Sequence, residues 1–178
     1  MKKIIVESYS VREAVLADIP RLIELGLAAY GQYAETLGAE QWDKMRQNLS
    51  NEAMYAELLN KSTCFVTSHS GVVVGMAFLV SSGNPIDVYE ADWSAVRLVA
   101  VHPSHKGKHI AKTLTQLCIN KAIANGEKTI ALHTSSMMPA AMHIYESFGF
   151  KVLRDLGKRF GQPYFLYTLD IPAKTSAQ

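Results

Sequence analysis

Apolar residues along the chain follow two different periods, and the alternation of these periods predicts strands interleaved with helices. Residues 72–80, VVVGMAFLV, are almost entirely apolar, and residues 63–68 precede them across a turn at Ser70–Gly71. This pair predicts an antiparallel hairpin whose second strand is apolar on both faces and therefore central in its sheet. Strands are expected at 11–14, 63–68, 72–80, 95–101, 128–133, 150–154 and 164–171. Strands interleaved with helices predict an α/β layered domain with a mixed sheet.

Helical spacing of apolar residues predicts the elements between these strands. Asp18 is expected to cap the first helix, with Pro20 in its first turn, where a missing N–H does no harm. The pattern predicts two short helices within residues 30–60, a helix over 110–125, and a last helix before the closing strands. The residues that mark these boundaries are breaks at Gly38 and Ser50–Asn51, an end near Asn125–Gly126, an N-cap at Ser136 and a stop at Gly149.

Length and composition indicate one globular domain. The chain has 178 residues, of which 48% are hydrophobic and 19% charged. A domain of this size buries enough surface to need no disulfide or metal staple. We expect a single domain over residues 1–172 and a short tail over 173–178. The net charge of +2 is too small to indicate nucleic acid as a partner.

Three further features argue against export and membrane insertion. The apolar stretch 72–80 is much shorter than the ~18 residues that span a bilayer. The apolar run 4–6 ends at Glu7, whereas the hydrophobic part of a signal peptide needs about seven residues. Cys64 and Cys118 are far apart without a CxxC spacing, and each is expected to be a small buried hydrophobe. We therefore expect a cytoplasmic protein without a membrane partner.

The most informative segment is a strand, a short basic turn and a helix start over residues 99–111, VAVHPSHKGKHIA. No Asp or Glu occurs within residues 93–126, which carry five Lys or Arg. Backbone N–H groups at a helix N-terminus suit a phosphate, so the turn is a candidate anion site, although a solvated basic helix start fits the charges equally well. His102, His105 and His109 lie among lysines without a nearby Cys, Asp or Glu, so no metal is expected.

Two motifs occur in order along the second half of the chain. The first, a V-x-P strand end followed by a basic, glycine-containing turn and a helix, is matched at Val101, Pro103, Lys106, Gly107, Ile110, Ala111 and Leu114. The second, A-x-x-[LI]-Y-x-x-x-G-F, is matched at Ala141, Ile144, Tyr145, Gly149 and Phe150. With these motifs, and with its order of elements over 11–171, the chain resembles the GNAT superfamily of acetyl-CoA-dependent N-acetyltransferases. The resemblance implies an α/β fold with a mixed, largely antiparallel central sheet of about six to seven strands flanked by helices.

The resemblance also implies a donor, acetyl-CoA, lying against the strand that ends at Val101 with its pyrophosphate over the turn 106–111. The implied cofactor-binding residues are Val99, Ala100, Val101, Lys106, Gly107, Lys108, His109, Ile110, Ala111, Met138, Ala141 and Tyr145. An N–H of Val99 or Val101 would polarise the thioester carbonyl, and Tyr145 would donate a proton to the departing thiolate. By spacing alone, Tyr145 is a core aromatic on an apolar helix face.

Four positions depart from the family pattern. Ser104 stands where Gln or Arg is usual, His109 where Gly or Ala is usual, and Met138 where Asn is frequent. Ala95 occupies the strand position that is often a catalytic Glu. The first three departures bear on cofactor affinity, and the last leaves the identity of the general base open.

A substrate ammonium must lose a proton before it can attack. Glu90 and Asp92 are the catalytic candidates, acting through an ordered water, and both are equally compatible with plain surface positions. Candidates for lining the acceptor site share a ring side chain, and each is also compatible with packing: Tyr30, Tyr33, Trp93 and His133. The expected acceptor is a primary amine of a small molecule or peptide. Polyamines, aminoglycosides, amino acids and protein N-termini all stay open.

Two functions of different class are consistent with these residues. The first is an acetyltransferase that moves acetyl from the CoA thioester to the amine by direct attack in a ternary complex. The second is an acyl-CoA-binding regulator on the same fold, with catalysis weakened by Ala95 and by the altered turn. Neither function requires nucleic acid or a membrane, and both allow a homodimer.

Overall fold

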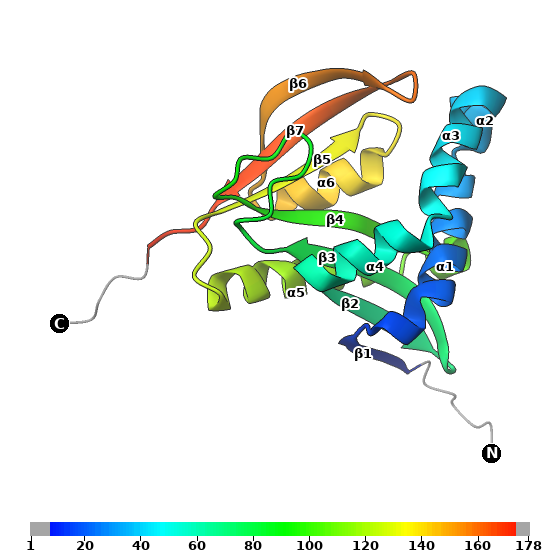
Figure 1. Ribbon diagram of the computed structural model, residues 1–178, viewed down its shortest axis with the longest axis horizontal. Helices are drawn as coiled ribbons and strands as arrows, with labels where there is room; N and C mark the ends of the chain where they lie inside the picture. The colour runs from blue at the N-terminus through cyan, green and yellow to red at the C-terminus, as the bar shows by residue number, and fades with distance from the viewer. Residues whose placement is uncertain (1–7, 174–178) are drawn as a thin grey trace.

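The computed structural model describes residues 8–173, and these residues form a seven-stranded sheet with helices on both faces (Figure 1). The strand order is β1-β2-β3-β4-β5-β7-β6. Neighbouring strands are antiparallel except β4 and β5, which are parallel. The strands are β1 (Tyr9–Glu13), β2 (Ser62–His69), β3 (Val72–Val80), β4 (Ser94–Val101), β5 (Thr129–Ser135), β6 (Lys151–Arg159) and β7 (Gln162–Asp170). The mixed, largely antiparallel α/β sheet expected from the sequence is therefore confirmed.

The helices lie where the apolar spacing predicts them, with one difference in number. They are α1 (Ile19–Gly31), α2 (Ala34–Leu37), α3 (Ala39–Leu49), α4 (Glu52–Lys61), α5 (Ile110–Ala124) and α6 (Pro139–Ser147). The breaks expected at Gly38 and Ser50–Asn51 are confirmed. The expectation of two helices in this region was wrong, because the described chain forms α2, α3 and α4 there. Gly38, with a φ of 79°, ends the short α2 and turns the chain into α3.

Two predicted helix caps are also corrected. Asp18 occupies the N-cap position of α1, but its side chain does not cap that helix. Its carboxylate instead accepts hydrogen bonds from the Arg12 guanidinium at 2.7 and 2.8 Å and from the Val15 N–H at 2.9 Å. Helix α6 starts at Pro139 rather than directly after Ser136, because proline suits the first turn of a helix, where its missing N–H has no partner to lose.

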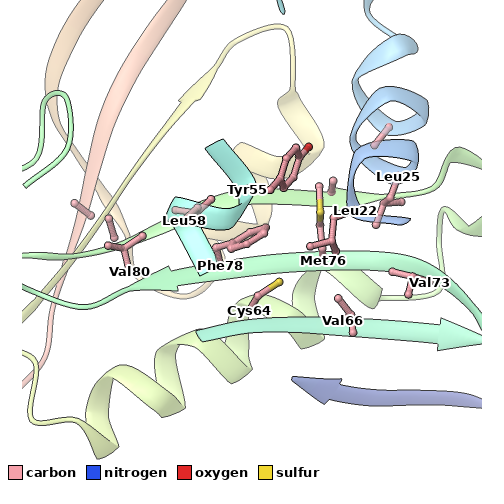
Figure 2. Packing of buried hydrophobic residues seen from close by; sticks show 14 of the residues in the cluster. Leu22, Leu25, Tyr55, Leu58, Cys64, Val66, Val73, Met76, Phe78 and Val80 are labelled. Atoms are coloured by element: carbon pink, nitrogen blue, oxygen red, sulfur yellow. The ribbon is translucent and has the colours of Figure 1, made fainter. Parts of the chain in front are cut away.

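Two apolar clusters hold the helices against opposite faces of the sheet. On one face α1 and α4 pack over β3, where Tyr55 lies beside Phe78 and Met76 (Figure 2). On the other face α5 packs over Ala77 and Leu79 of the same strand, and α6 lies beside α5 and against β5. Strand β3 therefore contributes alternate side chains to both clusters, which confirms its prediction as a central strand.

Cys64 and Cys118 are free, buried thiols, one in each apolar cluster. No helix within residues 8–173 is both long and apolar enough to cross a membrane. Of the expected tail, only Ala173 belongs to the described residues, and the apolar run 4–6 with Glu7 lies outside them.

Candidate active site

The sheet opens between its two parallel strands, β4 and β5. Their register contains only the pairs Ser94–Ile130 and Ala95–Ala131, at the start of both strands. Beyond these pairs the β5-facing edge of β4 has no partner strand among the described residues, so its peptide N–H and C=O groups are available to another extended chain.

An irregularity in β4 lies at the same place. Leu98 has a φ of 47°, a left-handed conformation that is costly for a branched side chain. Leu98 and Val99 together lie opposite the single Ala77 of β3, which is the arrangement of a β-bulge. Because a bulge bends its strand, it turns the second half of β4 away from β5.

Two neighbouring cavities, of about 360 and 160 Å³, lie along β4 where it leaves β5. The larger lies among α3, β4, β5 and the β6–β7 hairpin, and the smaller among α1, β4, α6 and the start of α5. The residues that line both cavities are Tyr30, Val99, Met138, Ala141 and Tyr145. These shared residues mark the junction between the two spaces.

Tyr145 stands at this junction on α6. Its side chain is 7% exposed, and its ring meets Phe150 edge-on with 6.0 Å between centroids. Its hydroxyl has no hydrogen-bond partner within residues 8–173. Burial raises the pKa of the phenol, so the proton stays on the oxygen at neutral pH. Tyr145 therefore holds an O–H donor, unused by the described protein groups, between the two cavities.

The smaller cavity gathers most of the residues expected to bind the cofactor. It is lined by Val99, Ala100 and Val101 of β4, by Lys106 of the basic turn, by Ala111 of α5, and by Met138, Ala141 and Tyr145. The free edge of β4 lies on the same side as this lining. The cavity is thus a channel that leads from the basic turn, along an unpaired strand edge, to the hydroxyl of Tyr145.

The middle of the basic turn, residues 107–109, lines neither cavity. Gly107 and His109 have φ angles of 75° and 60°, and His109 takes the N-cap position of α5 in the left-handed region. Gly107, Lys108 and His109 are exposed, whereas the side chain of Ile110 is buried. The first N–H groups of a helix have no acceptor inside it, so the start of α5 presents donors to an anion beside the mouth of the smaller cavity.

A glycine in β3 sets the position of this helix start. A Cβ atom at Gly75 would lie 2.6 Å from Cγ2 of Ile110 and 3.1 Å from Cδ1 of Leu114. Since real Cβ contacts are longer, α5 could not approach the sheet so closely over any other residue. Gly75 therefore helps to place the amides of the turn next to the edge of β4.

The larger cavity is polar at the end formed by β4 and β5. Arg97 of β4 and His133 of β5 both line it. The Tyr89 hydroxyl hydrogen-bonds Nδ1 of His133, and the ring of Tyr164 lies 5.9 Å from the imidazole. Burial, together with the positive charges of Arg97 and Arg159, lowers the pKa of His133 to about 4. The imidazole is therefore neutral at pH 7, and its Nδ1 shares a hydrogen bond with the Tyr89 hydroxyl.

The residues expected to serve the acceptor and its proton are not all brought together. Tyr30 lines both cavities and Tyr33 lines the smaller one. Trp93 packs against the apolar cluster below α1 and α4 and lines neither cavity. Glu90 and Asp92 are exposed on the loop before β4 and also line neither cavity.

Several lining residues were missed by reasoning from sequence. Phe160 and Tyr164 reach the larger cavity from the β6–β7 hairpin, which is distant in the chain from β4. Arg97 was counted only as part of a basic stretch, although a cation inside an otherwise apolar strand, SAVRLVAV, is itself a signal. Ala95 is 4% exposed within an apolar cluster, so the strand offers no polar side chain at that position.

Two histidines of the basic segment, His102 and His105, belong to an aromatic cluster near β1 and β2. The ring of His105 lies 5.3 Å from that of His69 and 6.2 Å from that of His102. The Tyr9 hydroxyl lies 3.0 Å from Nδ1 of His105. Within residues 8–173, no three His, Cys, Asp or Glu side chains are grouped so that they could hold a metal ion.

Known proteins share this arrangement of strands and helices. The chain is 26% identical over 158 residues to the L-amino acid N-acyltransferase MnaT of Escherichia coli (strain K12). The match covers 86% of this chain and 87% of MnaT. The structure of PaiA N-acetyltransferase from Thermoplasma acidophilum in complex with coenzyme A superposes with a TM-score of 0.74 at 15% identity, over 92% of this chain and 99% of that one. YncA from Salmonella typhimurium, a putative acetyltransferase solved with its cofactor acetyl-CoA, superposes with a TM-score of 0.68 at 22% identity. This superposition covers 95% of this chain and 96% of YncA.

A sequence model described as the Acetyltransferase (GNAT) family matches residues 28–150. This range contains the last turn of α1, the strands β2 to β5, the basic turn and the helix that carries Tyr145. It covers more than half of the chain and includes both motifs that suggested the resemblance. The protein belongs to the GNAT family of acetyltransferases.

Proposed function

We propose that this chain transfers an acetyl group from acetyl-CoA to a primary amine by direct attack in a ternary complex. The observation that carries the proposal is the position of Tyr145, whose unpartnered hydroxyl lies where the two cavities meet. One cavity begins at a basic turn and the other lies among helices and the β6–β7 hairpin. This division provides separate spaces for a donor and an acceptor.

The residues of the smaller cavity fit acetyl-CoA. The amides at the start of α5 and the side chain of Lys106 suit a pyrophosphate, and the free edge of β4 suits the amide groups of pantetheine. Acetyl-CoA supplies a thioester carbonyl for the amine to attack and a thiolate that can leave. Two proteins that superpose on this chain were solved with coenzyme A and with acetyl-CoA, which supports the same donor here.

The chain's own groups then have distinct tasks. The N–H of Val99 or Val101 on the free edge of β4 donates a hydrogen bond to a carbonyl oxygen beside it. Tyr145 donates its O–H to the leaving sulfur. Because burial raises the pKa of this phenol, its proton is held tightly, and its contribution is a hydrogen bond completed late in the reaction.

We keep Glu90 and Asp92 as candidates for removing the amine proton, acting through water because both are exposed outside the cavities. A relay through either residue predicts that Glu90→Gln or Asp92→Asn lowers kcat at neutral pH, with partial recovery at higher pH. A role limited to attracting a cation predicts a higher KM for the amine at unchanged kcat. Glu24→Gln, an exposed change on α1, is the matched control. If kcat and KM for the amine are unchanged in both variants, the loop that carries Glu90 and Asp92 takes no part in the reaction.

The proposal is tested by following CoA release from acetyl-CoA against a panel of amines. An acetyltransferase releases CoA faster with at least one amine than without any, and mass spectrometry finds the acetylated amine. An acyl-CoA-binding regulator binds acetyl-CoA in calorimetry but releases no CoA above the rate of hydrolysis. Cytoplasmic localisation, a homodimer and the single domain over 1–172 stay predictions.

A further inference from the structure

Arg97 is a cation that lines the larger cavity, the proposed acceptor cavity, and has no hydrogen-bonded or ion-paired partner within residues 8–173. Its side chain is partly buried, it lines the larger cavity, and it lies one residue before the bulge at Leu98. It makes no hydrogen bond or ion pair with any residue in the described part of the chain. Arginines taken out of water are normally paired, because leaving the charge without a partner costs free energy. An unpaired guanidinium that faces a cavity is therefore available to an anion from outside.

No acid in the described chain lines the larger cavity to neutralise this charge. Asp87 lies within electrostatic range of Arg97, but its carboxylate accepts two hydrogen bonds from Arg159, at 2.5 and 2.7 Å. The other polar groups of the lining are neutral: the imidazole of His133, the amides of Asn48 and Asn51, and hydroxyl groups. The cavity is thus positive, which disfavours acceptors that carry several ammonium groups.

The cavity is small, and the remainder of its lining is uncharged and largely apolar. Its volume of about 360 Å³ lies near the lower end of the range for small-molecule sites. Met45, Leu49, Met54 and Phe160 provide an apolar wall opposite the polar end. This combination of one cation, an apolar wall and limited space suits a small molecule with one carboxylate and an apolar side chain.

We propose that the acceptor is a free α-amino acid with an apolar side chain, and that Arg97 binds its carboxylate. The inference rests on the proposed amine acetylation and adds the class of the amine. In an α-amino acid the carboxylate is two bonds from the nitrogen, so a carboxylate on Arg97 keeps the amine in the cavity that Tyr145 borders. A peptide N-terminus has an uncharged amide at the position of the carboxylate, and a polyamine has no anionic group there.

The experiment compares amino acids with their carboxamides at saturating acetyl-CoA. The probes are L-leucine, L-methionine and L-phenylalanine, each with its carboxamide, together with spermidine. For the wild type we expect kcat/KM for the amino acids to exceed that for the carboxamides by about 30-fold or more, the loss that removing one partner of a buried ion pair causes. Arg97→Gln should raise KM for the amino acids without raising KM for the cationic carboxamides, and so abolish the preference. Arg97→Lys should keep part of it.

Arg154→Gln, a change of an exposed arginine on β6, is the matched control and should keep the full preference. A second readout does not depend on transfer: titration of L-leucine into enzyme saturated with CoA should detect binding in the wild type and in Arg154→Gln but not in Arg97→Gln.

The outcomes separate the two proposals. If spermidine or the carboxamides are acetylated as well as the amino acids, the inference is overturned and the acetyltransferase stands. A preference for amino acids that persists in Arg97→Gln also overturns it. If no amine is acetylated, the proposed function fails, and the L-leucine titration still decides whether Arg97 holds a carboxylate.

Discussion

The role of Tyr145 can be tested by removing one oxygen atom. In Tyr145→Phe the ring and its edge contact with Phe150 remain, and no protein hydrogen bond within residues 8–173 is lost. We therefore expect the free energy of unfolding to change by less than about 1 kcal/mol. General-acid assistance is usually worth about 10²–10⁴-fold, and the raised pKa of this phenol favours the lower end, so kcat should fall by about 10²-fold. KM for acetyl-CoA should stay within about threefold, because the interaction is made mainly in the transition state.

The matched control removes a hydroxyl from the core instead. The Tyr55 hydroxyl is buried and has no hydrogen-bond partner among the described residues, and Tyr55 lines neither cavity. Tyr55→Phe should leave kcat unchanged and raise the free energy of unfolding by up to about 1–3 kcal/mol, because an unpaired buried polar group disappears. Steady-state kinetics and urea unfolding measure both effects. A Tyr145→Phe enzyme with normal kcat and reduced stability would show that Tyr145 is only a packing residue.

Three further changes test the basic turn, the ion pair between Arg12 and Asp18, and the close contact of α5 with Gly75. Gly107→Glu should weaken CoA binding about fivefold or more in calorimetry, relative to the control Gly107→Ala. Both variants strain the backbone at a φ of 75°, but only Glu adds a negative charge. Equal affinities of the two variants for CoA would show that the turn does not bind the anion. The hydrogen bonds from Arg12 hold the pKa of Asp18 at about 2, below its usual 3.8, so Asp18→Asn should cost about 2 kcal/mol at pH 7. This stabilisation is present above about pH 4 and is lost as the pH falls toward 2, so the wild type and the variant should converge there in acid unfolding, and a constant difference would contradict the assignment. Gly75→Ala should lower the free energy of unfolding by about 1–3 kcal/mol, and by less in an Ile110→Ala background, where the contacting methyl group is absent.

Much of the fold is readable from local pattern. The uninterrupted apolar run of β3 predicts a strand buried on both faces, and both apolar clusters use it. The breaks at Gly38 and Ser50–Asn51 follow from residues that end helices. The incorrect helix cap has a similarly local cause. Asp18 is a residue type that often caps helices, but here its carboxylate pairs with the Arg12 guanidinium of β1. The sequence shows that a residue can accept a hydrogen bond, but it does not show which group will donate that bond.

One part of the candidate site is likewise readable from local sequence, and the other part is not. The basic turn and Tyr145 are carried by short motifs, since a strand–turn–helix and a tyrosine on a helix face are built from neighbours in the chain. The acceptor cavity has no such signature. It depends on the bulge at Leu98, on the few pairs between β4 and β5, and on a hairpin that brings Phe160 into the same lining as Arg97. Sequence period shows which face of a strand is buried, but strand order and register decide which distant side chains share a space, and a bulge changes that register without an apolar pattern to mark it.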